Sequence, residues 1–126
     1  MKKLLLGAFA SMALLCFSAG AWADQVSEVF ECELEKGMTM ANAQAVNATW
    51  LAFMHANVSE DITSVAAIVL VGKSDEFRYV DTYPDLATWA AAKAALETDE
   101  GKAVQSGFEG IIECDKNKLY RLQNTE

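Results

Sequence analysis

The chain has 126 residues, 52% of them hydrophobic, and carries 18 acidic against 10 basic side chains, a formal net charge of −8. Nucleic acids and anionic membrane surfaces bind clustered lysine and arginine, so this balance argues against both as partners. The length fits one domain with a modest core.

The first 23 residues have the pattern of a secretory signal peptide. Lys2 and Lys3 give a positive start, Leu4 to Phe17 is an apolar run too short to span a bilayer comfortably, and Ala21-Trp22-Ala23 places small residues where a signal peptidase cleaves. We expect cleavage after Ala23 and a periplasmic or secreted domain of residues 24–126 without a membrane anchor. Loss of the two lysines takes its net charge from −8 to −10.

The three cysteines have different expected roles. Cys16 raises the alternative of a lipoprotein, in which an acylated cysteine becomes the N-terminus, but the bulky Leu15 before it does not fit a lipobox. Cys32 and Cys114 are too far apart in sequence for a CxxC redox or zinc motif. In an oxidising compartment we expect them to form one structural disulfide. The alternative is two reactive thiols, although neither has a basic neighbour in sequence to lower its pKa.

A strand and a helix come first in the exported part. Residues 26–34 alternate between two faces, which predicts a strand. One of these faces carries Val26, Glu28, Phe30, Cys32 and Leu34. Thr39 can then cap a helix that runs to about Asn57. Its apolar stripe consists of Val46, Trp50, Phe53 and Met54. His55, the only histidine, points away from this stripe, and we expect it to be exposed and non-catalytic.

A hairpin is predicted in the middle of the chain. Thr63 to Val71 is a nearly continuous apolar run, which favours a strand buried on both faces. Residues 72–75 contain glycine and form the turn. Phe77 to Tyr83 is rich in aromatic and β-branched residues and reads as the returning strand.

The last third predicts two helices and a final strand. Pro84-Asp85 opens a helix from Leu86 to Glu97. Residues 98–100 cap a shorter helix that Gly107 ends. A short strand at 111–114 follows, then a turn or bulge at 115–117, and residues 119–122 continue or follow the strand.

The element order is β-α-β-β-α-β, which predicts an α+β ferredoxin-like sandwich with an antiparallel sheet and two helices on one face. First and last strands are neighbours in that topology, so Cys32 and Cys114 would lie side by side. The disulfide and the element order therefore support each other.

The chain resembles the dimeric α/β-barrel superfamily, whose ferredoxin-like domains pair their sheets into a shared barrel. The resemblance rests on element order, on the apolar second strand and on the second helix, where Trp89 is followed by Thr98-Asp99-Glu100-Gly101-Lys102-Ala103. It implies a homodimer. Members include cofactor-free antibiotic-biosynthesis monooxygenases and haem-degrading enzymes. The latter spread an Asn, a Trp and a His over a strand and the second helix, whereas Asn47, Trp50 and His55 share one helix here, so the resemblance does not carry that activity over.

Two groups of candidate ligand-binding residues lie on the predicted sheet. Glu31, Glu33 and Glu113 fall on matching faces of the first and last strands and can bind a cation or share a proton. The alternative is an ordinary solvated acidic face. Arg78 can hold an anion, or it can pair with Glu31 or Glu33.

The other group lies on the opposite face. Tyr79, Asp81 and Tyr83 share a face and can line a pocket, or the tyrosines can be core residues with satisfied hydroxyls. Lys93 lies in the apolar stripe of the second helix, where it either faces a cavity and binds an anion or extends its ammonium to solvent. Trp50 and Trp89 are expected in the core.

Two functions follow from these residues. The first is a non-catalytic homodimer that binds a small ligand or a protein partner, because the sequence contains no nucleotide-binding or nucleophile motif. The second is a cofactor-independent monooxygenase or isomerase that uses Tyr79, Asp81, Tyr83 and Lys93. We predict no cofactor, and no metal, because one histidine without a cysteine pair makes a zinc site improbable.

Overall fold

The computed structural model describes residues 24–72 and 75–125. The predicted signal peptide, with Cys16, lies outside these ranges, as do Lys73 and Ser74 of the predicted turn. The elements follow in the order β1 (Val26–Leu34), α1 (Met40–Asn57), β2 (Thr63–Ile68), β3 (Glu76–Tyr83), α2 (Leu86–Leu96), α3 (Asp99–Ser106) and β4 (Ile112–Arg121). This is the ferredoxin-like order that the sequence predicts, and α3 is the short helix expected after Thr98.

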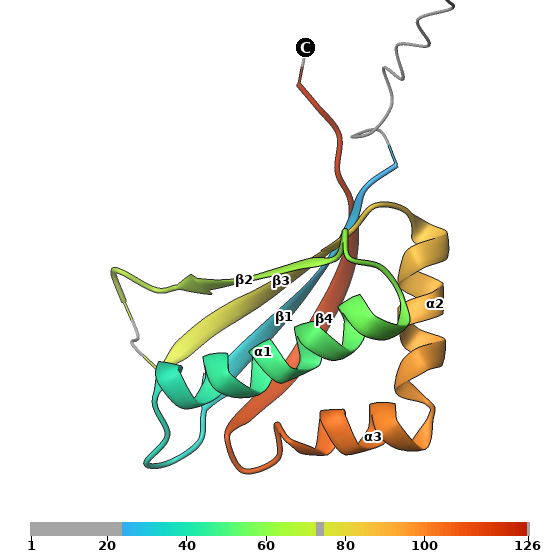
Figure 1. Ribbon diagram of the computed structural model, residues 1–126. Coiled ribbons are helices and arrows are strands. Elements are labelled where there is room, and N and C mark those ends of the chain that lie inside the picture. The colour runs from blue at the N-terminus through green and yellow to red at the C-terminus, as the bar shows by residue number, and fades with distance from the viewer. Residues whose placement is uncertain (1–23, 73–74, 126) are drawn as a thin grey trace, which may run out of the picture.

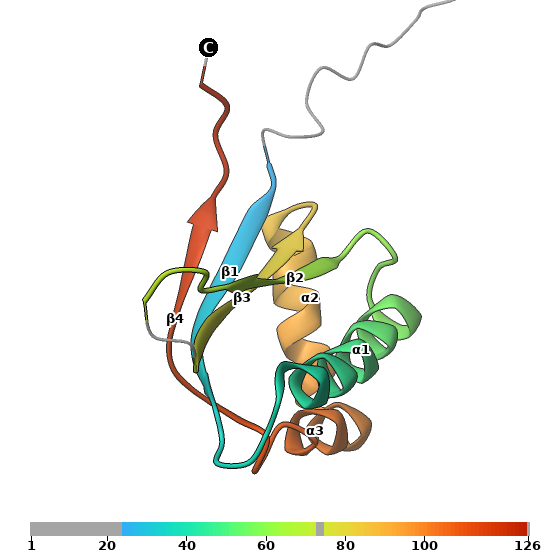
Figure 2. The same ribbon diagram turned by 90° about the vertical axis from the view of Figure 1, so that its left-hand side faces the viewer.

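The strands form one antiparallel sheet in the order β2-β3-β1-β4 (Figure 1). The helices α1, α2 and α3 lie on one side of it (Figure 2). We call this side the helix-covered face; on β1 it carries Val26, Glu28, Phe30 and Cys32. The other side, the open face, has no helix of the described residues over it.

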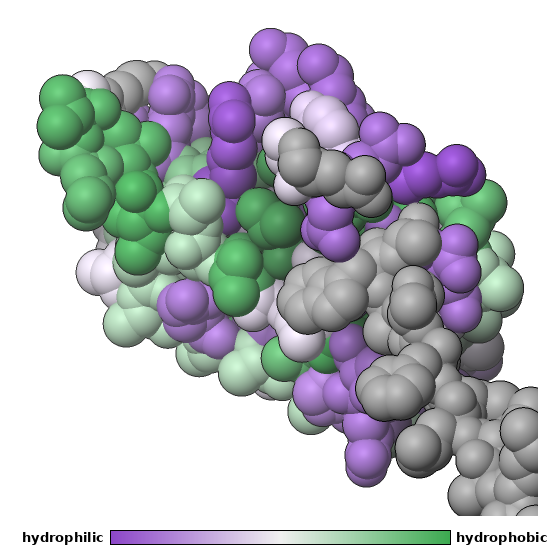
Figure 3. All heavy atoms as spheres, turned by 90° about the horizontal axis from the view of Figure 1, so that it is seen from above, coloured by the Kyte–Doolittle hydropathy of each residue, from purple (hydrophilic) through white to green (hydrophobic). Residues whose placement is uncertain are grey.

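The prediction that β2 is buried on both faces is wrong. Within residues 24–72 and 75–125, β2 pairs with β3 alone, and it ends at Ile68 rather than Val71. Val65 is 58% and Ile68 52% exposed. Beyond the strand, Leu70 and Val71 are 94% and 93% exposed. The hydrophobic cluster at the left of Figure 3 lies on the side toward which β2 runs in Figure 1. An apolar run does not reveal whether the protein's own chain covers it, and here the described chain does not.

The disulfide prediction is confirmed. Cys32 of β1 and Cys114 of β4 are register partners, 82 residues apart in sequence, and their sulfurs are bonded. Next to them the register shifts by one residue, so Asp115 is the extra residue of a β-bulge. The predicted turn or bulge is therefore a bulge inside one long strand. The bond ties the edge strand β4 to the centre of the sheet.

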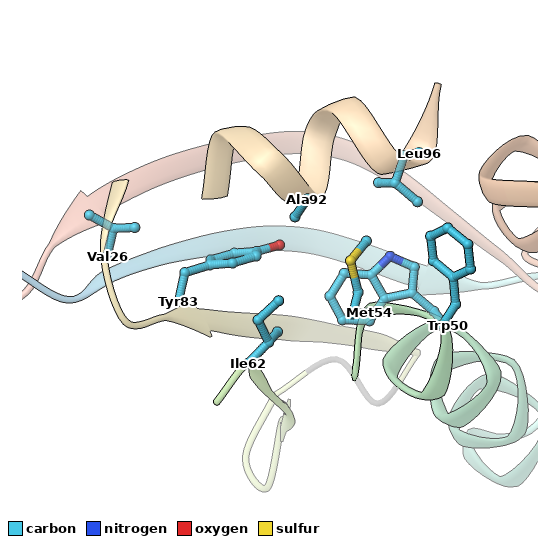
Figure 4. Close-up of a cluster of buried hydrophobic side chains, with 8 residues drawn as sticks. Val26, Trp50, Met54, Ile62, Tyr83, Ala92 and Leu96 are labelled. Atoms are coloured by element: carbon cyan, nitrogen blue, oxygen red, sulfur yellow. The ribbon is translucent and has the colours of Figure 1, made fainter. Parts of the chain in front are cut away.

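The core lies between the sheet and the helices (Figure 4). Its main cluster consists of Val26, Trp50, Phe53, Met54, Ile62, Tyr83, Ala92 and Leu96. Met54 and Tyr83 are at most 1% exposed. Thr39 caps α1 through a reciprocal pair of hydrogen bonds with Asn42, so the apolar stripe of α1 begins where the sequence predicts.

His55 differs from its expected place. It is half-buried rather than exposed, and its Nε2 lies 2.7 Å from the carbonyl oxygen of Ile62. The chain folds back at the end of α1 to begin β2, which brings that carbonyl against the helix. The helices within the described ranges are all too short or too polar to cross a membrane.

Candidate functional site

Two carboxylates are buried side by side on the helix-covered face. Glu28 of β1 and Asp81 of β3 are register partners, and they are only 2% and 5% exposed. A buried charge is costly unless it is paired and hydrogen-bonded. The partners of these two carboxylates therefore define the site.

Glu28 accepts two hydrogen bonds and forms one ion pair. The ammonium of Lys93 lies 2.5 Å from Oε2, and the indole N–H of Trp89 donates to the same oxygen at 3.1 Å. Asn117 donates its amide N–H to Oε1 at 2.7 Å. Trp89 and Lys93 are four residues apart on α2 and so share one face of the helix. Glu28 thereby joins α2 and β4 to the centre of the sheet.

Asp81 is held from the other side. The hydroxyl of Ser64 on β2 donates to Asp81 Oδ1 at 2.5 Å, and the side-chain amide of Asn47 on α1 donates to the Ser64 oxygen at 2.9 Å. Asn47 is itself 7% exposed. Within residues 24–72 and 75–125, no donor other than Ser64 hydrogen-bonds to the Asp81 side chain. Its second oxygen, Oδ2, therefore accepts no hydrogen bond from these residues.

A cavity of about 290 Å³ opens beside these groups, between the sheet and the helices. Its apolar wall comes from Phe30, Trp50, Leu96, Phe108 and Ile112. The polar groups on its lining are those of Asn47, Tyr79, Asp81, Lys93 and Gln105. An apolar cavity with a few convergent polar groups is the usual form of a small-molecule site.

The electrostatics of this cavity make one group titrate near neutral pH. Burial raises the pKa of Asp81 from 3.8 to about 6, and the charge of Glu28 adds to this, whereas the Ser64 hydrogen bond and Lys93 oppose it. Burial, and then the charge of Asp81, raises the pKa of Tyr79 to about 12 and that of Tyr83 well above its usual range. The tyrosine hydroxyls therefore stay protonated at neutral pH, whereas Asp81 changes charge near pH 6.

The structure separates the predicted residues into two groups. Tyr79, Asp81 and Lys93 line the cavity, and Tyr83 packs beside them in the core. The side chain of Lys93 is 37% exposed and lines the cavity, and its ammonium pairs with Glu28.

The remaining predicted residues lie on the open face. Arg78 Nη2 is 3.4 Å from Glu31 Oε1, which is the pairing weighed above. Glu33 is the register partner of Glu113, so the two carboxylates lie on the same face of neighbouring strands. Glu31, Glu33 and Arg78 border a separate hollow of about 400 Å³. Among the described residues no three His, Cys, Asp or Glu side chains are grouped so as to hold a metal ion.

Sequence reasoning did not single out four members of the site: Glu28, Asn47, Ser64 and Asn117. One signal was visible. Glu28 interrupts the apolar face of the first strand, just as Lys93 interrupts the apolar stripe of α2. Opposite charges at two such interruptions are expected to meet, because neither is stable alone in a core.

Comparisons with known proteins extend this description. No protein-family model matches the chain, and no curated protein sequence matches it. Solved structures do match. SnoaB of Streptomyces nogalater, a cofactor-independent oxygenase, superposes with a TM-score of 0.60 at 15% identity, over 82% of this chain and 97% of its own. A NIPSNAP family protein of unknown function from Agrobacterium tumefaciens gives 0.61 at 13% identity, over 82% and 93%.

A putative antibiotic biosynthesis monooxygenase from Caulobacter crescentus gives a TM-score of 0.55 at 14% identity, over 84% of this chain and 94% of its own. At such identities the likeness speaks for the fold and not for the activity. The chain therefore has the α+β ferredoxin-like fold of these structures.

Proposed function

We propose that this chain binds a small, largely apolar molecule, preferably an aromatic one, in the cavity between the sheet and the helices. The observation that supports this is the combination of an aromatic-lined cavity with Asp81 and Lys93 on its lining. A domain that only needed a stable core would fill this space with apolar side chains, because buried ion pairs seldom add stability over them. The polar groups orient a ligand, and the apolar wall supplies most of its binding energy.

The test blocks the cavity without touching its polar groups. Gln105 is exposed on α3 and lines the cavity. Gln105→Trp places a large ring there, whereas Ser106→Trp places the same ring on the same helix at an exposed residue that does not line it. We expect aromatic compounds from a metabolite panel to raise the Tm of the natural protein and of Ser106→Trp but not of Gln105→Trp. Equal shifts in all three proteins would show that binding occurs elsewhere.

The proposal includes a homodimer formed through the open face. Val65, Val80 and Val29 form one cross-strand row on that face. The strand that carries Val65, β2, is an uncharged edge strand. Uncharged apolar edges are an aggregation hazard unless something covers them. A second copy of the sheet supplies that cover. Val65→Lys is expected to produce monomers in sedimentation, whereas Ala90→Lys, at an exposed position of α2, is not. A natural protein that sediments as a monomer would exclude the dimer.

Export is also proposed. The support is the N-terminal pattern together with the Cys32–Cys114 bond, which is compatible with an extracytoplasmic location. N-terminal sequencing of the protein from its host is expected to begin at Asp24.

A second candidate is a cofactor-independent oxygenase. It is favoured by Asp81, whose carboxylate lies on the cavity and titrates near neutral pH, and by the similarity to SnoaB. Such an enzyme needs a base to activate its substrate toward oxygen, and Asp81 is placed for that role. Oxygen uptake with the ligands that bind, abolished by Asp81→Asn, would support it. Binding without oxygen uptake would leave the binding protein as the function.

A further inference from the structure

We propose that this cavity promotes proton exchange next to a carbonyl group, with Asp81 as the base and Lys93 as the group that stabilises the enolate oxygen. The inference rests on the proposed function, because it needs an apolar ligand in the cavity. It goes beyond binding, and it requires no oxygen.

The carboxylate is arranged as a base. Ser64 occupies Asp81 Oδ1, and the position of Ser64 is in turn fixed by Asn47. Oδ2 receives no hydrogen bond from the described residues, and the side chain lines the cavity. A carboxylate held by one oxygen and open at the other can accept a proton from a bound molecule without first breaking a protein contact.

The ammonium is arranged as the opposite pole. Lys93 has three N–H donors, and its Nζ forms an ion pair with Glu28 Oε2 at 2.5 Å. The ammonium also lies 5.6 Å from the centre of the Phe30 ring and 5.7 Å from that of Trp89, so aromatic walls flank it. Glu28 acts here as a positioning residue, since it fixes the ammonium beside the cavity through a contact that the ligand does not use.

Together the two poles select a chemical class of ligand. An acceptor oxygen suits Lys93, and an acidic hydrogen suits Asp81, so the ligand carries both within a few bonds of each other. An enolisable ketone attached to an aromatic body has this pattern, and its body matches the wall of Phe30, Trp50 and Phe108.

The step balances without another reactant. The C–H bond beside the carbonyl breaks, its proton moves to Asp81 Oδ2, and its electron pair forms a C=C bond. The carbonyl π electrons move onto oxygen, which the Lys93 ammonium stabilises. Return of the proton to the same carbon gives exchange, and its return to another carbon of the enolate gives an isomer. Nothing is oxidised or reduced.

The test uses 2-tetralone, an enolisable aromatic ketone, in D2O. Binding is measured by the change in tryptophan fluorescence, and replacement of hydrogen by deuterium beside the carbonyl is measured by NMR in the same samples. We expect the protein to accelerate exchange over buffer. Because a general base contributes about 10²–10⁴-fold, Asp81→Asn is expected to slow the catalysed exchange by about 100-fold or more while still binding the ketone. Asp61→Asn, on the exposed loop before β2, is the control and keeps the full rate.

A pH profile distinguishes a base from a merely structural residue. The rate is expected to rise as Asp81 loses its proton, with an inflection near its pKa of about 6. The charged and titratable groups that face Asp81 are Glu28 from β1, Lys93 from α2, and Tyr79 and Tyr83 from its own strand. Asn47 and Ser64, from α1 and β2, do not titrate. Lys93→Gln is expected to lower the rate and, because the charge of Lys93 lowers the pKa of Asp81, to move this inflection to higher pH.

The outcomes separate the two proposals. Bound 2-tetralone with no acceleration over buffer, or with equal rates in the natural protein and Asp81→Asn, overturns this inference alone. Failure of 2-tetralone to bind at millimolar concentration also overturns this inference, whereas the binding cavity itself is overturned only if no aromatic compound of the panel gives a Tm shift that Gln105→Trp abolishes.

Discussion

Asp81→Asn should make the protein more stable at neutral pH. The folded protein raises the pKa of this carboxyl from 3.8 to about 6, mainly by burial. The folded state therefore holds the proton more tightly than the unfolded state does. The free energy of unfolding is highest below the pKa of Asp81 in the unfolded state. It falls as the pH rises from that pKa to the pKa in the folded state, and the loss is complete above the folded-state pKa. The rise of the Asp81 pKa from 3.8 to about 6 corresponds to a loss of about 3 kcal/mol once the pH is well above 6.

Asparagine removes this dependence and keeps much of the geometry. Its side-chain oxygen can still accept the Ser64 hydroxyl, and its amide group replaces the second carboxylate oxygen. At about pH 7.5 we expect the substitution to increase the free energy of unfolding by as much as about 3 kcal/mol. At about pH 4.5 most of that gain should be absent. The diagnostic quantity is the difference between the stability gains at about pH 7.5 and about pH 4.5, which is about 2 kcal/mol. Effects of the substitution that do not depend on pH cancel in this difference.

Urea unfolding of both proteins at the two pH values measures this difference. Asp61→Asn, which removes one exposed carboxylate, controls for the general effect of net charge. A gain or loss that is the same at both pH values would refute the reasoning. It would mean that burial does not disfavour the charged form of Asp81, and the case for this residue as a base near neutral pH would fall with it.

Two further predictions concern the scaffold of the site. Reduction of the Cys32–Cys114 bond, or its replacement by two serines, should lower the free energy of unfolding by roughly 4–5 kcal/mol, since the bond closes a loop of about 83 residues in the unfolded chain; urea unfolding with and without reductant measures this, and a loss under about 1 kcal/mol would contradict it. Gly101→Ala should lower the free energy of unfolding by about 2 kcal/mol or more, because a Cβ there would lie 2.2 Å from the Ala95 carbonyl oxygen and 2.5 Å from Leu96 Cα. Gly107→Ala, whose Cβ meets only Val104 O at 3.1 Å, is the milder comparison in thermal unfolding.

Local signals were enough to predict most of the fold. Thr39, Asp85 and Thr98 each accept a backbone N–H at the start of a helix, so the helix starts follow from short-range chemistry. The two cysteines added one long-range constraint, which fixed β4 beside β1. Element order and one disulfide together leave little freedom in a domain of this size.

The burial of β2 and the contents of the site needed information that local patterns do not hold. Residues 63–71 have the same apolar sequence whether a neighbour of the same chain or a separate molecule covers them. The donors to Glu28 are 61 residues away at Trp89 and 89 residues away at Asn117. No periodicity links such positions. In the sequence Glu28 is therefore only an interruption of an apolar strand face, and its place at the centre of a hydrogen-bond network is visible only in the fold.

The two faces of the sheet differ in whether their charged side chains are exposed to water or buried. On the open face, Arg78 and Glu31 are 60% and 41% exposed, and surface pairs of this kind contribute little to stability. On the helix-covered face, Glu28 and Asp81 are withdrawn from water, although an apolar pair of the same size would give a core at least as stable. The sheet could carry its charges on the open face alone and fold well. The buried pair therefore argues for selection on the chemistry of the cavity, and a protein in which Asp81→Asn gains stability but loses function would have the trade-off expected of a working site.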